Sequence, residues 1–206
     1  MKKGEKAILK RLRSVDGKDS QFEAEAISIV LEKLQSDRFK FDGRTVYTAD
    51  RSTLVYVLQS YTNLLIPEGV RTIGRRAAAR QVNLTKLFLA PTVEKIGKEA
   101  FAGCVKLESV TLPASVKSVC GLAFAYCEKL KEVTFESVPK FLAHKAFFDC
   151  KSLQIIRVPE GSAESFRKSL RVADDEDVQI IEQTSTMPEQ KNESVAEKEA
   201  GQGGSE

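Results

Sequence analysis

The sequence has no tryptophan and a single histidine, His144, among its 206 residues. One imidazole excludes a metal centre built from several histidines and leaves only one candidate base for a nucleophile. P-loop and dinucleotide-binding glycine patterns are missing, and so are the C-x-x-C pairs typical of structural zinc sites. No apolar run approaches the roughly 18 residues that span a bilayer. We therefore expect no enzyme activity, no bound metal, no cofactor and no membrane span.

The start of the chain lacks the apolar run that follows the basic segment of a signal peptide. Lys10, Arg11 and Arg13 interrupt the apolar residues that come after the basic start. This pattern predicts a cytoplasmic protein. Apolar residues make up 42% of the chain and charged residues 30%, which is ordinary for a chain that buries a globular core.

The charge is unevenly distributed along the chain. Residues 1–40 carry ten basic and seven acidic side chains, residues 41–172 carry 20 and 12, and residues 173–206 carry two and ten. A basic body is therefore followed by an acidic end. Residues 183–206 contain few sizeable apolar side chains, so we expect a disordered acidic tail there, because such a segment cannot offset its ordering entropy.

The clearest feature of the sequence is a repeat of 23 residues. Leucine, alanine, phenylalanine and cysteine each return at this step, in the columns Leu84/Leu107/Leu130/Leu153, Ala100/Ala123/Ala146, Phe101/Phe124/Phe147 and Cys104/Cys127/Cys150. A divergent earlier copy begins at Tyr61. Several columns with one period indicate about five stacked units over residues 61–160, each of which buries its apolar edge against its neighbours.

Each unit is expected to contain one short strand, a second apolar pair and a turn. Apolar residues at offsets 3 and 5 of a unit, such as Val110 and Leu112, share one face of a strand, and offset 4 points away. A proline ends the strand in four units. A second apolar pair follows, as in Val116 and Val119, and the Ala-Phe-x-x-Cys segment predicts a helical turn with Phe and Cys on one face.

The stretch from Lys106 to Cys127, with Leu107, Val110, Leu112, Pro113 and the Ala-Phe-x-x-Cys ending, resembles the BspA-like, or treponemal, class of leucine-rich repeats. This resemblance implies a β-rich (α+β) solenoid without chemistry of its own that binds another protein. Many members of the family are secreted or surface-displayed proteins that bind host or matrix proteins. An adhesin role for this chain would require an export signal that its sequence does not display.

The two ends of a solenoid need caps, because they expose sheet edges. We expect a basic helical region over 1–40, a hairpin-like cap over 41–60 and a helix and strand over 161–182. Residues 21–35 have capping-box spacing at Ser20 and Glu23 and an apolar stripe, so they predict an amphipathic helix that either caps the first coil or dimerises. Ser162 is the expected cap of the C-terminal helix, which places Phe166 and Leu170 against the last coil.

The cysteine column raises three alternatives: a zinc site with His144, a disulfide between neighbouring coils, and small buried apolar side chains. Zinc sites usually take their ligands from closely spaced cysteine pairs, and a disulfide does not persist in a reducing compartment. We therefore expect four free thiols, with Cys120 at a position where other repeats have Gly74 or Gly97.

Basic residues suggest a second class of partner. Lysine and arginine cluster near the start of the chain, and Arg71, Arg75, Arg76 and Arg80 lie in the first coil. Such clusters favour nucleic acid or an anionic surface, but aromatic side chains are not interleaved among them. Nucleic acid therefore remains the alternative to a protein partner.

The outward positions of the strands give the candidate binding site. At offset 4, Leu65 and Phe88 are expected side by side in solvent on an otherwise polar face, where large apolar side chains indicate a contact patch. Cover by the preceding hairpin or the N-terminal region is the alternative. The rim is predicted to contain Lys86, Glu108, Lys131 and Glu132. The partner's identity and the oligomeric state do not follow from the sequence.

Overall fold

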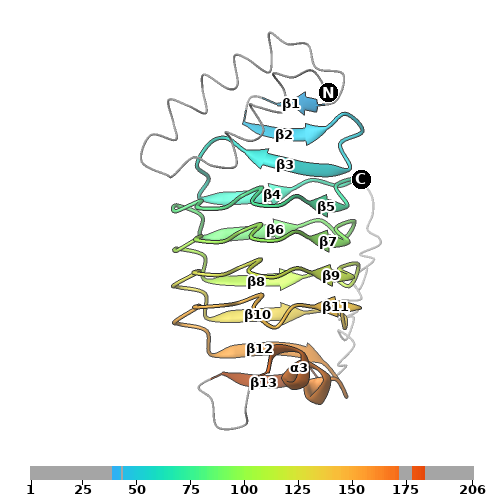
Figure 1. The fold of residues 1–206 in the computed structure, drawn as a ribbon, viewed down its shortest axis with the longest axis vertical. Coiled ribbons are helices and arrows are strands. Elements are labelled where there is room, and N and C mark those ends of the chain that lie inside the picture. Colours follow the sequence, from blue (N-terminus) through green and yellow to red (C-terminus); the bar gives the residue numbers. More distant parts are fainter. Residues whose placement is uncertain (1–38, 43, 172–177, 184–206) are drawn as a thin grey trace, which may run out of the picture.

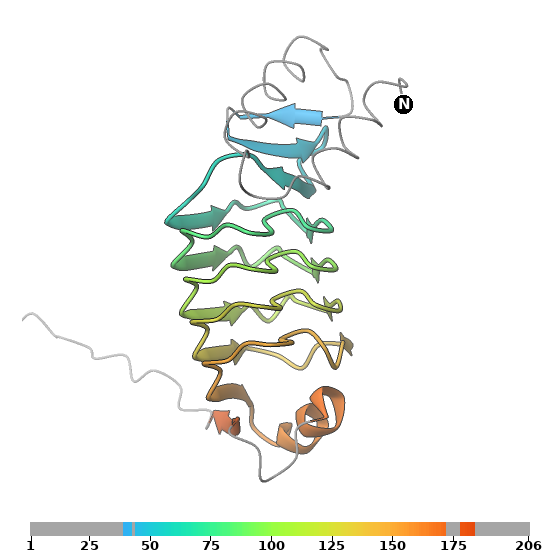
Figure 2. The ribbon, with the colours of Figure 1, turned by 60° about the vertical axis from the view of Figure 1, so that its left-hand side comes forward.

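The computed structural model describes residues 39–42, 44–171 and 178–183. They form an elongated stack of coils, with successive coils following one another along the long axis (Figure 1). Figure 2 shows the strands in two layers on opposite sides of the stack. The predicted five-coil solenoid is confirmed, because strands fall at the expected positions of every 23-residue unit.

The first layer is a six-stranded sheet in which all neighbouring strands are parallel. Its strands, in spatial order, are β4 (Asn63–Ile66), β6 (Lys86–Leu89), β8 (Ser109–Leu112), β10 (Glu132–Phe135), β12 (Ile155–Pro159) and β13 (Gln179–Gln183). Residues of β4 to β12 that are 23 apart in sequence pair directly, as Val110 pairs with Val133. Equivalent side chains therefore meet in rows along the stack.

The second layer is a seven-stranded sheet made of a hairpin region and four very short strands. Its strands are β1 (Phe39–Phe41), β2 (Thr45–Thr48), β3 (Thr53–Val57), β5 (Thr72–Ile73), β7 (Lys95–Ile96), β9 (Ser118–Val119) and β11 (Phe141–Leu142). β1, β2 and β3 pair antiparallel, and from β3 onward the sheet is parallel. A hairpin region thus precedes the first full coil.

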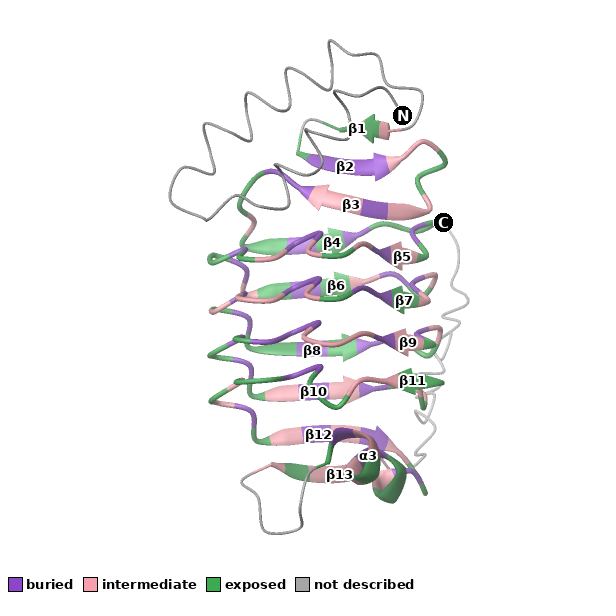
Figure 3. Ribbon diagram, in the orientation of Figure 1, coloured by how far each residue is buried: buried purple, intermediate pink, exposed green. Residues whose placement is uncertain are grey.

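The main core lies between the two sheets and follows the alternation of strands such as β4 and β8 (Figure 3). A second, smaller apolar cluster contains Val46 and Leu58 of the hairpin region. In β4, Leu64 and Ile66 are buried while Asn63 and Leu65 are exposed, and β8 repeats this pattern. The phenylalanine column stacks through the core, with ring centroids 5.2 Å apart for Phe101 and Phe124 and 5.6 Å apart for Phe124 and Phe147. Such contacts add to the stabilisation from burial.

The Ala-Phe-x-x-Cys segment is a series of tight turns, which corrects the predicted helical turn. The Ala125 N–H donates to the Leu122 carbonyl within the coil, whereas the Phe124 N–H donates to Ala146 on the next coil. Every second amide N–H of this segment therefore donates to the next coil and cannot form a hydrogen bond within a helix. The backbone is left-handed at two sets of equivalent positions, one occupied by Arg76, Glu99 and Leu122 and the other by Arg80, Gly103, Tyr126 and Asp149.

The C-terminal end contains the expected helix and strand, but its cap differs from the prediction. The helix α3 (Ala163–Leu170) buries Phe166 and Leu170. The Ser162 hydroxyl donates to the Pro159 carbonyl and makes no capping bond. Instead the Glu182 carboxylate, from β13, accepts the Ala163 N–H at 2.9 Å. Backbone N–H donors, that of Ala163 first, lower the pKa of Glu182.

Several expected segments lie outside the described residues. These are nearly all of the region 1–40, including the amphipathic segment 21–35, and residues 184–206 of the acidic tail. Gln183, where we expected the tail to begin, belongs to β13 and its side-chain amide donates to the Phe135 carbonyl at 3.3 Å.

The phenylalanine row generates the first prediction. Phe124→Ala should lower the free energy of unfolding by about 3–5 kcal/mol, because it removes a fully buried ring that stacks on two neighbours. Deletion of residues 184–206 is the control and should change it by less than about 0.5 kcal/mol. Denaturant unfolding measures both variants. Equal destabilisation would contradict the central place of this row in the core.

Candidate functional site

The outward face of the six-stranded sheet is built from strand positions that the core cannot use. Leu65 in β4 and Phe88 in β6 are direct register partners, as the 23-residue spacing predicts. Their side chains are 69% and 52% exposed. Leu65 and Phe88 therefore form an apolar pair that projects from adjacent strands. We call this pair, with Lys86, Glu108, Lys131 and Glu132, the six-stranded face.

The polar members of the six-stranded face lie over three strands and the turns before them. Lys86 begins β6 beside Asn63, and Glu132 begins β10 beside Ser109. Lys86, Glu108 and Lys131 are exposed, whereas Glu132 is half-buried. The Glu132 carboxylate accepts the Arg157 Nε–H at 2.7 Å. Comparison of residues 23 apart in the sequence did not predict this ion pair. A diagonal spacing of 25 residues, one coil and two strand positions, is the signal for this pair.

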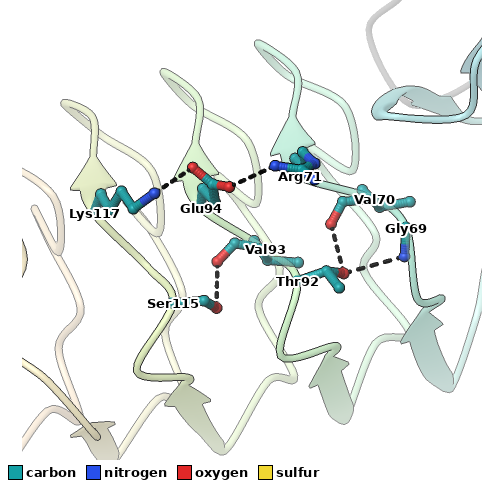
Figure 4. A network of polar contacts seen from close by, with 8 residues as sticks. All are labelled: Gly69, Val70, Arg71, Thr92, Val93, Glu94, Ser115 and Lys117. Carbon is teal, nitrogen blue, oxygen red and sulfur yellow. Dashed lines mark hydrogen bonds and ion pairs between the residues drawn. The ribbon is translucent and has the colours of Figure 1, made fainter.

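The opposite, seven-stranded side of the stack carries ion pairs between coils. Glu94 lies between Arg71 and Lys117, with N–O distances of 3.1 Å and 2.7 Å (Figure 4). Hydrogen bonding and the charge of Lys117, followed by the effect of Arg71, lower the pKa of Glu94. The same side has a second carboxylate, Glu99, which pairs with Arg76 and lies 3.9 Å from Arg75. The predicted first-coil arginines are thus partly neutralised by the next coil.

Hydroxyl groups join neighbouring coils beside these ion pairs. The Thr92 hydroxyl donates to the Val70 carbonyl at 3.0 Å and accepts the Gly69 N–H at 3.2 Å (Figure 4). The Ser115 hydroxyl, one coil further, donates to the Val93 carbonyl at 2.7 Å. Equivalent bonds on successive coils hold the backbone below the charged side chains in a fixed register.

The cysteine column is a row of free thiols in the described part of the chain. Cys104 and Cys127 are buried, and each thiol donates to a backbone carbonyl of the preceding coil at 3.4 Å. The Cys150 thiol does the same at 3.0 Å. The neighbouring thiol and burial raise the pKa of both Cys127 and Cys150. A protonated thiol is a weak nucleophile and a poor metal ligand.

The candidate zinc arrangement does not assemble among the described residues. No group of three or more histidine, cysteine, aspartate or glutamate side chains in residues 39–42, 44–171 and 178–183 is placed to hold a metal ion. His144 is exposed, whereas Cys127 of the preceding coil is buried.

Sequence reasoning missed three exposed aromatic residues outside the six-stranded face. Phe141, in β11, is 55% exposed. Tyr126 and Phe148 meet edge to face with ring centroids 5.8 Å apart, and the Lys145 ammonium lies 5.6 Å from the Phe148 centroid. The 23-residue columns could have indicated Phe141, because Thr72, Lys95 and Ser118 occupy the equivalent outward position in other coils. They give no such signal for Phe148, because its column contains alanines, one of which, Ala125, is buried.

Comparison with known proteins agrees with this architecture. The model of the BspA type leucine-rich repeat region matches residues 53–170 with six copies. This is more than half of the chain, which therefore belongs to this family of leucine-rich repeat proteins. Families with this repeat commonly mediate protein interactions and are generally not enzymes. A search of curated proteins finds no match.

Solved structures of leucine-rich repeat proteins match this chain at low sequence identity. A leucine-rich repeat protein from Eubacterium ventriosum has a TM-score of 0.57 at 17% identity, covering 71% of this chain and 40% of that one. A leucine-rich cell surface protein from Faecalibacterium prausnitzii has a TM-score of 0.46 at 20% identity, covering 65% and 42%. The T. pallidum leucine-rich repeat protein has a TM-score of 0.44 at 20% identity, covering 71% and 80%. This chain thus spans less than half the length of the first two.

None of the helices in the described part of the chain is long and apolar enough to cross a bilayer.

Thiol counting tests the state of the cysteine row. Protein unfolded without reductant should release four titratable thiols, and elemental analysis should find no stoichiometric zinc. Two or fewer thiols would instead indicate disulfides formed in an oxidising compartment.

The raised thiol pKa values predict a loss of stability at alkaline pH. The pKa of Cys127 and Cys150 is higher in the folded than in the unfolded chain, so the unfolded state loses protons first as pH rises. Their contribution is complete below about pH 8.5 and falls above it, by up to about 1.4 kcal/mol per pH unit for each thiol. Denaturant unfolding between about pH 7.5 and 9.5 measures this slope.

The matched variant is Cys127→Ala with Cys150→Ala. It should be less stable at neutral pH, but its stability should fall less steeply with pH than that of the unmodified protein. An unchanged slope would show that other groups cause the alkaline loss.

Proposed function

We propose that this protein is a non-catalytic scaffold that binds a protein partner through the six-stranded face. The observation that carries the proposal is the pairing of Leu65 and Phe88 on adjacent strands, 69% and 52% exposed. Two large apolar side chains in solvent raise the free energy of the unbound protein, and a partner that covers them recovers this energy.

The surroundings of this pair fit the usual anatomy of an interface. Lys86, Glu108 and Lys131 are exposed and lie in or just before β6, β8 and β10, so they would form a polar rim on the side of the apolar pair away from the sheet edge at β4. Glu132 contributes less as a charge, because Arg157 already pairs with its carboxylate. We therefore expect Phe88 to be the main anchor, and the rim to determine which partner is accepted.

The outer surface of the whole six-stranded sheet, of which these residues are part, limits the area that a partner can contact. Six strands at roughly 4.8 Å and four residues per strand give an area of roughly 30 Å by 13 Å. A standard interface buries about 800 Å² per partner, so it would occupy most of this sheet together with neighbouring turns. A partner of domain size, rather than a short peptide, fits that requirement.

We further propose a cytoplasmic location and no cofactor. A reducing compartment would keep the cysteine row in the free state that the structure contains. An exported form would use the same six-stranded face as an adhesin. Nucleic acid is less favoured as the partner, since carboxylates on the second coil pair with Arg71 and Arg76.

The test compares two exposed phenylalanines on opposite sheets. Phe88→Glu should abolish capture of the partner from native extract, while the melting temperature stays within about 2 °C because the side chain lies outside the core. The matched control is Phe141→Glu, at a residue that is 55% exposed on the seven-stranded sheet, and it should retain capture. The captured proteins should be the same with and without nuclease treatment.

Two outcomes would overturn the proposal. If Phe88→Glu unfolds the protein, other parts of the chain cover Phe88 and the six-stranded face is not a docking surface. If Phe88→Glu and Phe141→Glu reduce capture equally, the six-stranded face does not select the partner.

A further inference from the structure

The two outer faces of the solenoid differ strongly in charge. On the six-stranded sheet, Lys86, Lys131 and Arg157 are nearly balanced by Glu108 and Glu132. The seven-stranded side has only two carboxylates between Arg71 and Lys145, Glu94 and Glu99. Its cations are Arg71, Arg75, Arg76, Lys95, Lys98, Lys117, Lys140 and Lys145. We call these eight cations with their two carboxylates the basic face.

One carboxylate of the basic face shows how this surface holds an anion. Glu94 lies between Arg71 of the preceding coil and Lys117 of the following coil, at 3.1 Å and 2.7 Å (Figure 4). The arginine and lysine are still 69% and 55% exposed at their side chains. A carboxylate placed between cations of successive coils is therefore well accommodated, and the cations remain accessible from solvent.

The row that contains Arg71, Glu94 and Lys117 continues to the next coil without a second carboxylate. Lys140 stands one coil beyond Lys117 at the equivalent position, and Phe141 bonds through its N–H to the Lys117 carbonyl. Lys95 is the exposed residue of β7, in the row next to Glu94. Within the described ranges neither Lys95 nor Lys140 forms an ion pair. Adjacent like charges on neighbouring strands are unfavourable, and an external anion relieves this repulsion.

We propose that the basic face binds an acidic, extended protein segment that runs along the stack and places its carboxylates between cations of successive coils. Coils follow one another at roughly 4.8 Å, and side chains on one face of an extended chain recur at roughly 6.8 Å. The coils from Arg71 to Lys140 therefore meet about two or three carboxylates. This surface is distinct from the six-stranded face and does not depend on its proposed role.

The side chains around these cations favour a polypeptide over nucleic acid. Single-stranded nucleic acid is usually bound where bases stack on aromatic side chains among the cations. The outward row of the short strands reads Thr72, Lys95, Ser118 and Phe141, so its aromatic ring stands at one end only.

The experiment measures binding of a fluorescent peptide of about 12 residues, alternating glutamate and serine, by anisotropy at about 50 mM and 300 mM NaCl. The full chain should bind it saturably at low salt and several-fold more weakly at high salt. Lys95→Glu with Lys140→Glu should weaken binding at least about tenfold at low salt. The matched control is Lys129→Glu with Lys151→Glu, at exposed lysines in the turns before β10 and β12, and it should change binding less than about threefold.

Three outcomes would overturn this inference. One is the absence of saturable peptide binding at low salt. Another is equal weakening by the two double variants, which carry the same change of net charge and would then report attraction to the whole molecule. The third is tighter binding of an oligothymidylate of equal charge, which would assign the basic face to nucleic acid. Circular dichroism of both double variants verifies that the coils remain folded.

Discussion

The register of each coil on the next is the constraint from which the rest of this structure follows. Backbone amides donate to carbonyls of neighbouring coils, so residues 23 apart face each other directly. Every side chain is then a neighbour of its own equivalents. Rows of apolar residues gain from this arrangement, as in the stacked rings of Phe101, Phe124 and Phe147. Rows of like charge are destabilised by the same arrangement, because it holds equal charges one strand spacing apart.

This constraint explains where the outer rows vary. The row that begins Arg71, Glu94 and Lys117 alternates in sign over three coils, which turns a repulsive arrangement into two ion pairs. The alternation ends at Lys140, and the outward row beside it ends in Phe141. On the opposite sheet, the apolar pair Leu65 and Phe88 is followed in its row by Thr111. Outward positions that break a row of alternating charges or polar residues, such as Phe88 and Lys140, are the best candidates for contacts with other molecules.

The period made much of the fold predictable from the sequence. Strand positions, the buried phenylalanine column and the adjacency of Leu65 and Phe88 all follow from 23-residue spacing and strand alternation, and these predictions are confirmed. Burial of the cysteine column is confirmed at Cys104 and Cys127, whereas Cys150 is half-buried. The helical turn was wrong because local spacing does not reveal that alternate amides bond to the next coil. The Glu132–Arg157 ion pair joins two different rows, and the Glu182 cap joins segments outside the repeat. Comparison of residues 23 apart in the sequence therefore predicts neither contact.

The two proposed surfaces are chemically independent although they share one core. Six-stranded and seven-stranded sheets each present a separate outward row, and the inward rows between them are closed by apolar side chains. A substitution at an outward position therefore changes one surface without moving the other, since the register is fixed by the backbone and the core. The same property separates roles within one coil: β6 carries Phe88 outward on one side, and β7 carries Lys95 outward on the other. A scaffold of this kind can hold an apolar contact and an acidic segment at the same time, at fixed separation, with no conformational change required to couple them.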